Sequence, residues 1–528
     1  MRRFSSYGSP NNKTDYYVPR EALITNAIKQ LKDGHYITVW APRQTGKTWL
    51  MQEVVSRIDK EDQFDVVYLS LQFLYEENDP NIVAQLFAKE LMEKLNLEQL
   101  TINSLKDFHR LFKRGTLTKP LILILDEFDA LDTLVIARLV AVLRHIYNTR
   151  RSQTNKSTAE KDYLLHGLVL IGVRAVLGVE NVKGSPFNVQ RSLNIPNLTH
   201  DEVVYLFDCY QREQQQKIEP EVVERIWYEF KGQPGLTCWF GELLTETYNQ
   251  ATDQAITMTL FKGVYATALD LLPNNNILNI ISKAKQEAYK PYVLELFQTR
   301  KKVNFTYDDP MINFLYMNGV VSIDEVSLTE HYVKFPCPYI QKRLFNYFAR
   351  ELYQGMDGLY DPFEDLSDTI TGQNIDIHRL LQRYEQYLQA NREMVLKDAP
   401  RRKNDLRVFE AVFQFHLYLY LVSFFHGYEV QIVPEFPTGN GAIDLLMRYS
   451  GRLFGLELKS FANQPGYRNA LKQTAKYGKK LGVTEIWLVL FVEVVDDDNR
   501  QRFEMAYTDQ NGIVVHPLFV QTGSLLKN

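Results

Sequence analysis

Two kinds of apolar run along the chain predict two sheets. Residues 121–125 are unbroken and end in two acids, which favours a strand buried on both faces of a parallel sheet. Residues 37–40 predict a second buried strand. Residues 443–459 contain two β-prone runs around Ser450-Gly451, and a two-residue turn of this kind is typical of a β-hairpin. The pattern therefore predicts an α/β chain with a parallel sheet early and a hairpin late.

Composition narrows the class of protein. A chain of 528 residues is expected to hold about three or four domains. Hydrophobic residues make up 45% and charged residues 23%, as in ordinary globular proteins. No apolar run approaches the ~20 residues that cross a bilayer, the first residues lack a signal core, and the three cysteines lie far apart. We therefore expect a cytoplasmic protein without membrane contact. Its net charge of −4 means that only local patches can hold nucleic acid.

The loop after residues 37–40 has the residue types of a phosphate-binding P-loop. Glycine, lysine and threonine stand at the motif's spacing before an apolar helix, with alanine in place of the first glycine. Backbone amides of such a loop cradle phosphates, Lys47 reaches the β- and γ-phosphates, and Thr48 supplies an oxygen to Mg²⁺. ATP and Mg²⁺ are the expected cofactors. The predicted nucleotide-binding residues here are Ala41, Pro42, Arg43, Gln44, Thr45, Gly46, Lys47, Thr48 and Trp49.

Two acids follow the unbroken strand. Asp126 at its carboxyl end is predicted to hold Mg²⁺ through water, together with Thr48. Glu127 is predicted to polarise the attacking water, as a catalytic residue. Beside a P-loop, these acids indicate ATP hydrolysis as well as ATP binding.

Further segments resemble the AAA-like and STAND-type ATPases, in their archaeal-type branch, over roughly residues 15–250. The resembling segments are residues 17–21, 168–176, 184–188 and 231–235. The first is similar to the family's box before its first helix, and the last to a lid element whose proline lies near adenine. The resemblance implies that Arg20 and Pro234 contact the nucleotide.

Three arginines are candidates for sensing the γ-phosphate or for acting across subunits of a homo-oligomer. They are Arg43, Arg174 and Arg191. Each also suits an ordinary position at the surface or at the rim of the core, so the sequence does not choose among them.

The predicted hairpin carries an unusual pair of acids. If Ser450-Gly451 is the turn, Asp444 falls opposite Glu457, where Cβ atoms lie only ~5 Å apart and like charges are destabilising. Lys459 is two residues beyond Glu457, so both point from the same face. Two carboxylates and an ammonium suit Mg²⁺ or Mn²⁺ that activates water for phosphodiester cleavage. For Glu457 and Lys459 taken alone, the alternative is a surface ion pair.

Asp444 followed by residues 457–459 resembles the core of the PD-(D/E)XK nuclease superfamily, although Ile443 stands where proline is usual. Upstream, Glu410 lies in an apolar helix at a place where this superfamily commonly carries an acid. The resemblance implies a nuclease in which Asp444 and Glu457 bind metal, Lys459 is catalytic and Glu410 is an outer ligand.

Downstream of the hairpin, Gln473 and Tyr477 resemble the QxxxY motif of RecB-like nucleases. At i and i+4 they share one helix face. The resemblance implies that both position the nucleic-acid strand. The same helix predicts a DNA-backbone strip made of Arg468, Lys472, Lys476, Lys479 and Lys480.

Together these features predict a multidomain α/β fold. A P-loop NTPase parallel sheet is followed by a helical lid, a winged helix, and a PD-(D/E)XK restriction-endonuclease-like α/β/α domain. The winged helix rests on helices followed by a strand–turn–strand pattern at 321–336. The predicted segments are 1–14 (flexible N-terminus), 15–195 (AAA-like ATPase core), 196–276 (lid), 277–353 (winged helix), 354–400 (linker and bracing helix) and 401–528 (nuclease).

The expected function is an ATP-regulated, metal-dependent DNA nuclease in bacterial defence or DNA processing. Its expected partners are DNA, ATP, further copies of the chain and a protein or phage trigger. One alternative is a signalling ATPase whose nuclease domain only binds nucleic acid. The other is a transcription regulator that acts through the winged helix. DNA versus RNA, strand form and the activating signal stay open.

Overall fold

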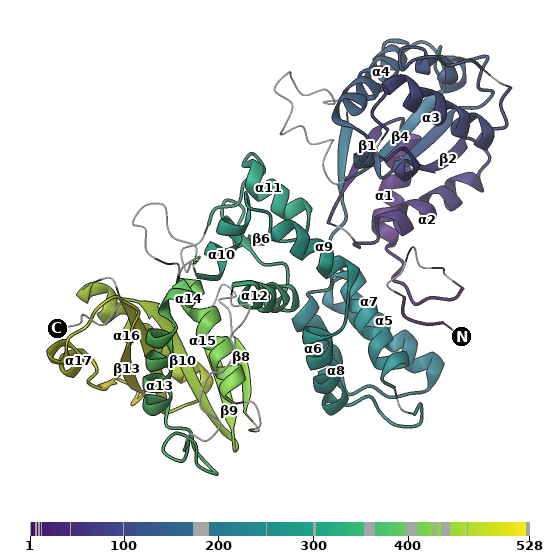
Figure 1. The fold of residues 1–528 in the computed structure, drawn as a ribbon. Helices are drawn as coiled ribbons and strands as arrows, with labels where there is room; N and C mark the ends of the chain where they lie inside the picture. Colours follow the sequence, from purple (N-terminus) through teal and green to yellow (C-terminus); the bar gives the residue numbers. More distant parts are fainter. Residues whose placement is uncertain are drawn as a thin grey trace. The chain divides into compact units, whose positions relative to one another are not determined.

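The computed structural model divides into two compact units (Figure 1). The N-terminal unit comprises Met1–Ile280 and Phe305–Ser322, and the C-terminal unit comprises Ile281–Asn304 and Ile323–Asn528. The structure describes residues 2–5, 8, 11, 13–42, 44–75, 77–98, 100–172, 190–249, 251–298, 303–352, 365–396, 399, 408, 410–425, 428, 430–434, 444–461 and 463–523.

A five-stranded parallel sheet in the order β2-β3-β4-β1-β5 forms the centre of the N-terminal unit. Its strands are β1 (Tyr36–Trp40), β2 (Asp65–Ser70), β3 (Leu121–Asp126), β4 (Leu165–Ile171) and β5 (Gln190–Asn194). Every residue of β3 and β4 is buried. This confirms the strand predicted from the apolar run at 121–125.

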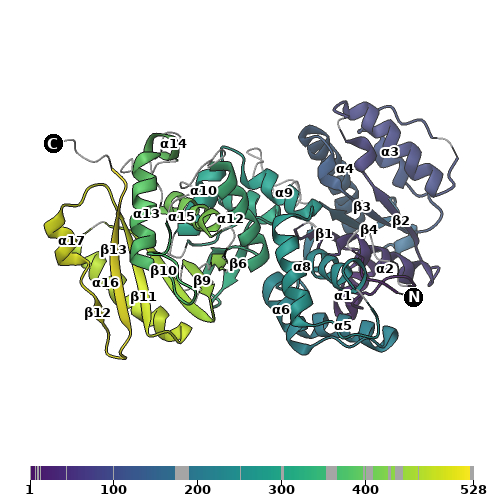
Figure 2. The ribbon, with the colours of Figure 1, turned by 60° about the horizontal axis from the view of Figure 1, so that its bottom comes forward.

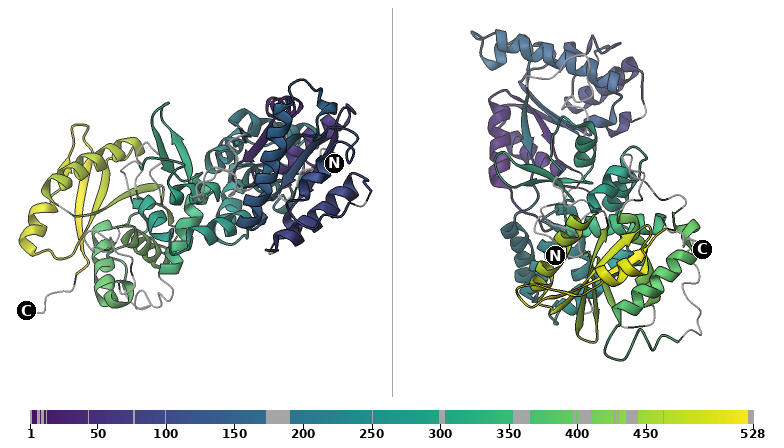
Figure 3. Two further views of the ribbon diagram at one scale, coloured as in Figure 1. Left: turned by 90° about the horizontal axis from the view of Figure 1, so that it is seen from above. Right: turned by 90° about the vertical axis from the view of Figure 1, so that its left-hand side faces the viewer.

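Helices cover both faces of this sheet (Figures 1 and 3). Alternate residues of β3 enter two separate cores: Leu123 packs with α3 and α4, and Ile124 packs with α1 and α2. The helices are α1 (Glu21–Lys32), α2 (Lys47–Asp59), α3 (Pro80–Lys94) and α4 (Thr133–Ser152). Short 3₁₀ turns cover Gln72–Leu74, Phe108–Phe112, Phe128–Ala130 and Thr158–Glu160.

A bundle of helices follows the sheet, in the segment predicted as the lid. It contains α5 (His200–Gln214), α6 (Pro220–Phe230), α7 (Pro234–Glu242), a π-turn (Leu243–Thr247) and α8 (Met258–Asp270). Thr199 caps α5 through a capping box with Glu202, which fixes where this bundle begins. The next helix, α9 (Asn275–Ala284), extends to the boundary of the unit, and α11 (Pro310–Met317) returns to it.

Part of the segment predicted as a flexible N-terminus, residues 1–14, is packed in the structure. Phe4 is buried, and its ring lies 5.1 Å from that of Tyr16 and 4.9 Å from that of Phe207, measured between centroids. Arg2 also forms an ion pair with Glu213 of α5. The described residues 2–5 therefore contact α5, while flexibility of the segment as a whole remains a prediction.

The C-terminal unit is built on a six-stranded mixed sheet in the order β12-β13-β11-β10-β9-β8. Strands β10, β11 and β13 run parallel, and the other pairings are antiparallel. The strands are β8 (Gln431–Pro434), β9 (Leu445–Tyr449), β10 (Arg452–Ser460), β11 (Glu485–Val492), β12 (Tyr507–Thr508) and β13 (Val514–Gln521).

Helices lie against both faces of the mixed sheet (Figure 2). On one face α16 (Gln464–Leu481) packs on Leu488 and Leu490. On the other, Phe413 of α15 (Glu410–Phe424) stacks on Phe491 at a centroid distance of 4.8 Å. The remaining elements are α10 (Lys290–Gln298), β6 (Ser322–Glu325), β7 (His331–Lys334), α12 (Pro338–Leu352), α13 (Ile377–Ala390), α14 (Arg392–Leu396) and α17 (Asp497–Phe503).

The winged-helix segment, 277–353, is divided between the two units. The predicted strand–turn–strand is present as β6 and β7, and α12 follows it. A winged helix as one folded body remains a prediction. Among the described residues, every helix is too short or too polar to span a bilayer.

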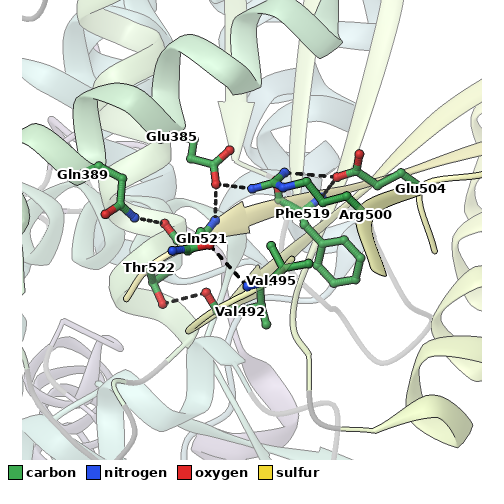
Figure 4. A network of polar contacts seen from close by, with 9 residues as sticks. All are labelled: Glu385, Gln389, Val492, Val495, Arg500, Glu504, Phe519, Gln521 and Thr522. Atoms are coloured by element: carbon green, nitrogen blue, oxygen red, sulfur yellow. Dashed lines mark hydrogen bonds and ion pairs between the residues drawn. The ribbon is translucent and has the colours of Figure 1, made fainter. Parts of the chain in front are cut away.

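Side chains bond to the part of β13 that the short strand β12 leaves unpaired (Figure 4). The Phe519 amide donates to Glu504 Oε1 and the Gln521 amide to Glu385 Oε1, each at 2.8 Å. Arg500 donates to the Phe519 carbonyl at 3.1 Å and forms ion pairs with both carboxylates. Because backbone groups at a sheet edge need partners, these side chains replace a neighbouring strand.

A buried histidine makes the C-terminal unit sensitive to acid. His416 is fully buried in α15, and its Nδ1 lies 2.9 Å from the Tyr384 hydroxyl. Burial lowers the pKa of His416 to about 3. A lowered folded pKa means that protonation favours unfolding, so stability falls as pH drops from about 6.5 towards 3.

Calorimetry at pH 7 and pH 4.5 tests this histidine. Over that interval the wild type should lose about 2–3 kcal/mol more unfolding free energy than His416→Gln. His378→Gln, which changes an exposed histidine of α13, serves as the control and should behave as the wild type. Equal acid sensitivity of the wild type and His416→Gln would contradict the assignment.

Candidate functional sites

The P-loop connects the end of β1 to the start of α2. Gly46 has a φ of +85° and Gln44 a φ of +56°, so the chain uses left-handed conformations to turn into the helix. Lys47 Nζ donates to the carbonyls of Ala41 at 2.8 Å and Pro42 at 2.6 Å. The lysine therefore spans the mouth of the loop, where it can exchange carbonyl oxygens for phosphate oxygens.

The metal-binding pair predicted for the nucleotide site is brought together. Thr48 Oγ1 donates to Asp126 Oδ2 at 2.8 Å, and the Glu127 amide donates to Asp126 Oδ1 at 2.8 Å. Tyr68 of β2 also donates its hydroxyl to Asp126 Oδ2. Sequence reasoning missed Tyr68, because its contact depends on the alignment of β2 with β3. Thr48 and Asp126 offer the hard oxygens that Mg²⁺ requires, so the residues fit this ion.

Glu127 stands in a left-handed conformation, with a φ of +54°, and its side chain is exposed. Ser70 Oγ donates to Glu127 Oε2 at 2.5 Å. Ser70 is also the residue paired with Asp126 across β2 and β3. The predicted catalytic carboxylate is thus held by a serine of β2, beside the acid predicted to bind metal.

Tyr68 is expected to position Asp126 for the metal. Burial, followed by the hydrogen bond to Asp126, raises the pKa of Tyr68, so it stays a donor. Tyr68→Phe should raise the Mg²⁺ concentration needed for half-maximal ATP turnover by about tenfold, since a hydrogen bond to a charged group contributes ~1.5–3 kcal/mol. Turnover measured against Mg²⁺ concentration tests this. Tyr75→Phe, an exposed tyrosine, is the control. An unchanged Mg²⁺ requirement would rule the role out.

The lid contacts the P-loop directly. The Gly235 amide donates to the Gln44 carbonyl at 3.1 Å, and Gln233 Nε2 donates to the same oxygen at 3.3 Å. Pro234 is the first residue of α7, between these two donors. A Cβ at Gly235 would lie 2.7 Å from the Cβ of Gln44, which cannot rotate away, so only glycine allows this approach. The structure thus places Pro234 beside the loop, while its contact with the nucleotide remains a prediction.

Two other predicted nucleotide residues, Trp49 and Arg20, use their side chains for contacts within the protein. Trp49 is packed in the core, with its ring 5.4 Å from that of Tyr17, because the helix turns it away from the loop. Arg20 donates to the carbonyls of Pro196 at 2.7 Å and Asn197 at 2.8 Å, which ties α1 to the chain before α5.

Of the three candidate arginines, only Arg191 is described. It pairs with Ile37 on the second residue of β5, near the amino ends of the strands. The P-loop follows the carboxyl end of β1, so Arg191 lies near the opposite end of the strands. Arg43 and Arg174 lie outside the described residues, as does the segment 184–188.

The predicted hairpin is present with the predicted turn. Ser450 and Gly451 have φ values of +46° and +76°, as a two-residue turn with two left-handed positions requires. Tyr449 pairs with Arg452, and the register continues to the pair of Leu445 and Leu456. The next position on each strand places Asp444 opposite Glu457.

Asp444, Glu457 and Lys459 form a compact charged cluster. Lys459 Nζ lies 3.5 Å from Glu457 Oε1 and 3.9 Å from Asp444 Oδ2. Asp444 Oδ2 accepts the Leu458 amide at 2.7 Å, which fixes this carboxylate across the two strands. Glu457 is fully buried and Asp444 is 8% exposed. Among the described residues, these two buried carboxylates lie beside one ammonium, an arrangement in which a bound divalent cation would offset their charge.

The cluster lies on the same sheet face as α16. Glu457 and Lys459 are in register with Leu488 and Leu490, the β11 residues on which α16 packs. On this helix Gln473 Nε2 donates to the Tyr477 hydroxyl at 3.1 Å. All five basic residues of the predicted strip are exposed. Glu410 begins α15 on the other face, and its side chain lies outside the described residues.

A divalent cation fits the donor set of this cluster. Mg²⁺ typically uses one or two carboxylates and keeps several waters. Asp444 and Glu457 supply two carboxylates, and the described residues contain no group of three or more metal-ligating side chains. The fit is therefore to a hydrated ion rather than to a closed protein cage.

A P-loop after the first strand of a parallel sheet, with an acid at the carboxyl end of β3, which β4 separates from β1, defines a P-loop NTPase-like fold. Residues 5–270 match the family model described as the AAA-like domain, and the chain belongs to this family. No curated protein matches the chain.

Solved structures are similar to parts of this chain at low identity and low TM-score. A Walker-type ATPase of Pyrococcus abyssi is 13% identical, with a TM-score of 0.44, covering 65% of this chain and 99% of that one. The Aeropyrum pernix ORC1 protein, solved in complex with DNA, is 16% identical, with a TM-score of 0.34 and coverage of 67% and 98%. The Thermotoga maritima RuvB Holliday junction branch migration motor is 15% identical, with a TM-score of 0.33 and coverage of 60% and 92%.

Proposed function

We propose that this AAA-like ATPase carries a metal-dependent nuclease in its C-terminal unit and regulates it with ATP. The observation that carries the proposal is the cluster of Asp444, Glu457 and Lys459 at the end of β10. Buried like charges are costly unless a function or a cation requires them. The proposed substrate is nucleic acid, with DNA preferred, and the proposed setting is bacterial defence or DNA processing in the cytoplasm.

At the nucleotide site each residue has a role that its contacts allow. Lys47 leaves the carbonyls of Ala41 and Pro42 to contact the β- and γ-phosphates. Thr48 and Asp126 would hold Mg²⁺, which neutralises phosphate charge when bound. Glu127, held by Ser70, orients the attacking water.

At the nuclease site the protein fixes the reacting groups. A cation held by Asp444 and Glu457 would supply positive charge and an activated water. Asp444 is kept in place by the Leu458 amide. Lys459, which also donates to the Leu458 carbonyl at 2.7 Å, can turn its ammonium towards a non-bridging phosphate oxygen and stabilise the charge that develops there.

The lid provides the route by which ATP acts. Gln44 of the P-loop is bonded to Gly235 and Gln233 at the start of α7, so a change of the loop on phosphate binding moves the lid. In this proposal ATP sets how the lobes of the ATPase are arranged. That arrangement determines whether the nuclease site can act on its substrate. A protein or phage component is the proposed trigger.

A gel assay tests this function. Purified protein is incubated with labelled single- and double-stranded DNA and RNA, with Mg²⁺, Mn²⁺ or chelator, and with or without ATP. The proposal expects cleavage that requires the metal and responds to ATP. Intact substrate under every condition would contradict nuclease activity.

Nucleic-acid binding without cleavage is the second candidate, favoured by the exposed basic strip of α16. It predicts salt-dependent binding and no nicking of plasmid. Regulation through the predicted winged helix would instead show sequence-selective DNA binding that survives deletion of residues 375–528.

A further inference from the structure

A cavity of about 840 Å³ lies at the carboxyl ends of β10, β11 and β13. Its size falls within the ~300–1,000 Å³ of small-molecule sites. One wall is Phe461, two residues beyond Lys459, which corresponds to about 7 Å of extended chain. The cavity and the proposed cleavage site therefore lie at the same end of the sheet.

Three aromatic rings line the cavity. The centroid of Phe461 lies 5.5 Å from that of Phe519 and 6.2 Å from that of Phe503. Phe461 and Phe503 are only partly buried. Partly exposed aromatic rings of this kind offer a stacking surface to a planar ligand, and such stacking tolerates any base.

The cavity also contains a buried amide with an unused donor. Gln521 is 5% exposed, and its Oε1 accepts the Val495 amide at 3.2 Å. Within the described part of the chain, its Nε2 donates to no acceptor. The Gln521 donor is accessible to solvent, so a ligand carbonyl or ring nitrogen can take the place of water as its acceptor.

The remaining polar groups favour a neutral ligand over a phosphate. Asn463, Gln464 and Asn499 add carboxamides, and none of the lysines and arginines that the structure describes lines the cavity. Asp496 and Asp497 also line it, and their charge would repel phosphate. Aromatic faces with carboxamide donors and acceptors are the chemistry that recognises a nucleobase.

We propose that this cavity binds the base of the nucleotide next to the scissile phosphate. The inference rests on the proposed nuclease function and adds its substrate form: the base must be unpaired, because a base inside a duplex cannot enter a pocket. Single strands, loops and frayed ends are therefore the preferred substrates.

Nucleoside binding to the full-length protein tests the cavity without requiring cleavage. Saturation-transfer NMR is recorded with thymidine, cytidine and deoxycytidine, which avoids adenine and so the ATP site. Val494, 53% exposed, lines the cavity, and Val494→Trp should fill it and weaken binding by about tenfold or more. Met505→Trp, at a site 67% exposed and outside the cavity, is the control and should bind as the wild type.

A second variant tests the unused donor. Gln521→Glu keeps the shape and the acceptor for Val495 but replaces Nε2 with oxygen, and binding should weaken to a similar degree. No transfer to any pyrimidine nucleoside, or equal binding by the wild type and Val494→Trp, would overturn the proposal. If the protein binds nucleosides but cleaves no substrate, the nuclease proposal is refuted and the cavity proposal is supported. If the wild type and Val494→Trp cleave unpaired strands equally well, the cavity proposal is refuted and the nuclease proposal is kept.

Discussion

Asp444→Asn is expected to abolish metal-dependent cleavage while ATP turnover stays close to that of the wild type. Asparagine keeps the size of the side chain and can still accept the Leu458 amide. It removes one of the two negative charges that would hold the cation. We expect cleavage to fall about a thousandfold, which corresponds to the several kcal/mol that a bound metal contributes to the transition state.

The control is Glu485→Gln, the same chemical change on an exposed acid at the amino end of β11. It should cut as the wild type does. If Asp444→Asn loses cleavage and ATP turnover together, the two activities are not separable or the site is misassigned. If Asp444→Asn cuts normally, the cluster is structural.

Lys47→Ala is expected to remove ATP turnover and with it the response of the nuclease to ATP. The lysine spans the P-loop through Ala41 and Pro42, so its loss removes the main positive charge of the phosphate site. We expect turnover to fall by about two orders of magnitude or more, because the variant lacks an ammonium that stabilises transition-state charge. Cleavage by the variant should stay at one level whether or not ATP is added.

Phosphate release and gel cleavage of the same preparations measure both effects. Lys60→Ala, at the exposed carboxyl end of the same helix, is the control and should leave both unchanged. ATP gating is refuted if Lys47→Ala cuts as well as the wild type with and without ATP. In that case the two units would work independently.

Local sequence predicted the hairpin well because its register is set by two turn residues. Once Ser450 and Gly451 adopt positive φ, the position of Asp444 against Glu457 follows by counting. The P-loop was predicted equally well, because its motif is a fixed spacing of residues that lie close together in the sequence. Buried runs predicted β3 for the same reason.

Contacts that depend on tertiary alignment could not be predicted. Tyr68 and Ser70 reach Asp126 and Glu127 only because β2 lies beside β3 in one register. Trp49 follows Thr48 in sequence, but helical rotation turns it into the core. In each case neighbours in space are set by the sheet or helix and not by distance along the chain.

The side chains on β13 have a consequence for how copies of this protein behave at high concentration. An open strand edge is a template on which another chain can add, and such addition leads to aggregation. Here Glu385, Arg500 and Glu504 occupy the groups that an incoming strand would use. These three residues come from α13 and from α17 and the residue after it, so the protection exists only once distant parts of the unit have folded together. A newly completed chain has this edge unguarded until the unit has folded, and that interval is when self-association is most favoured.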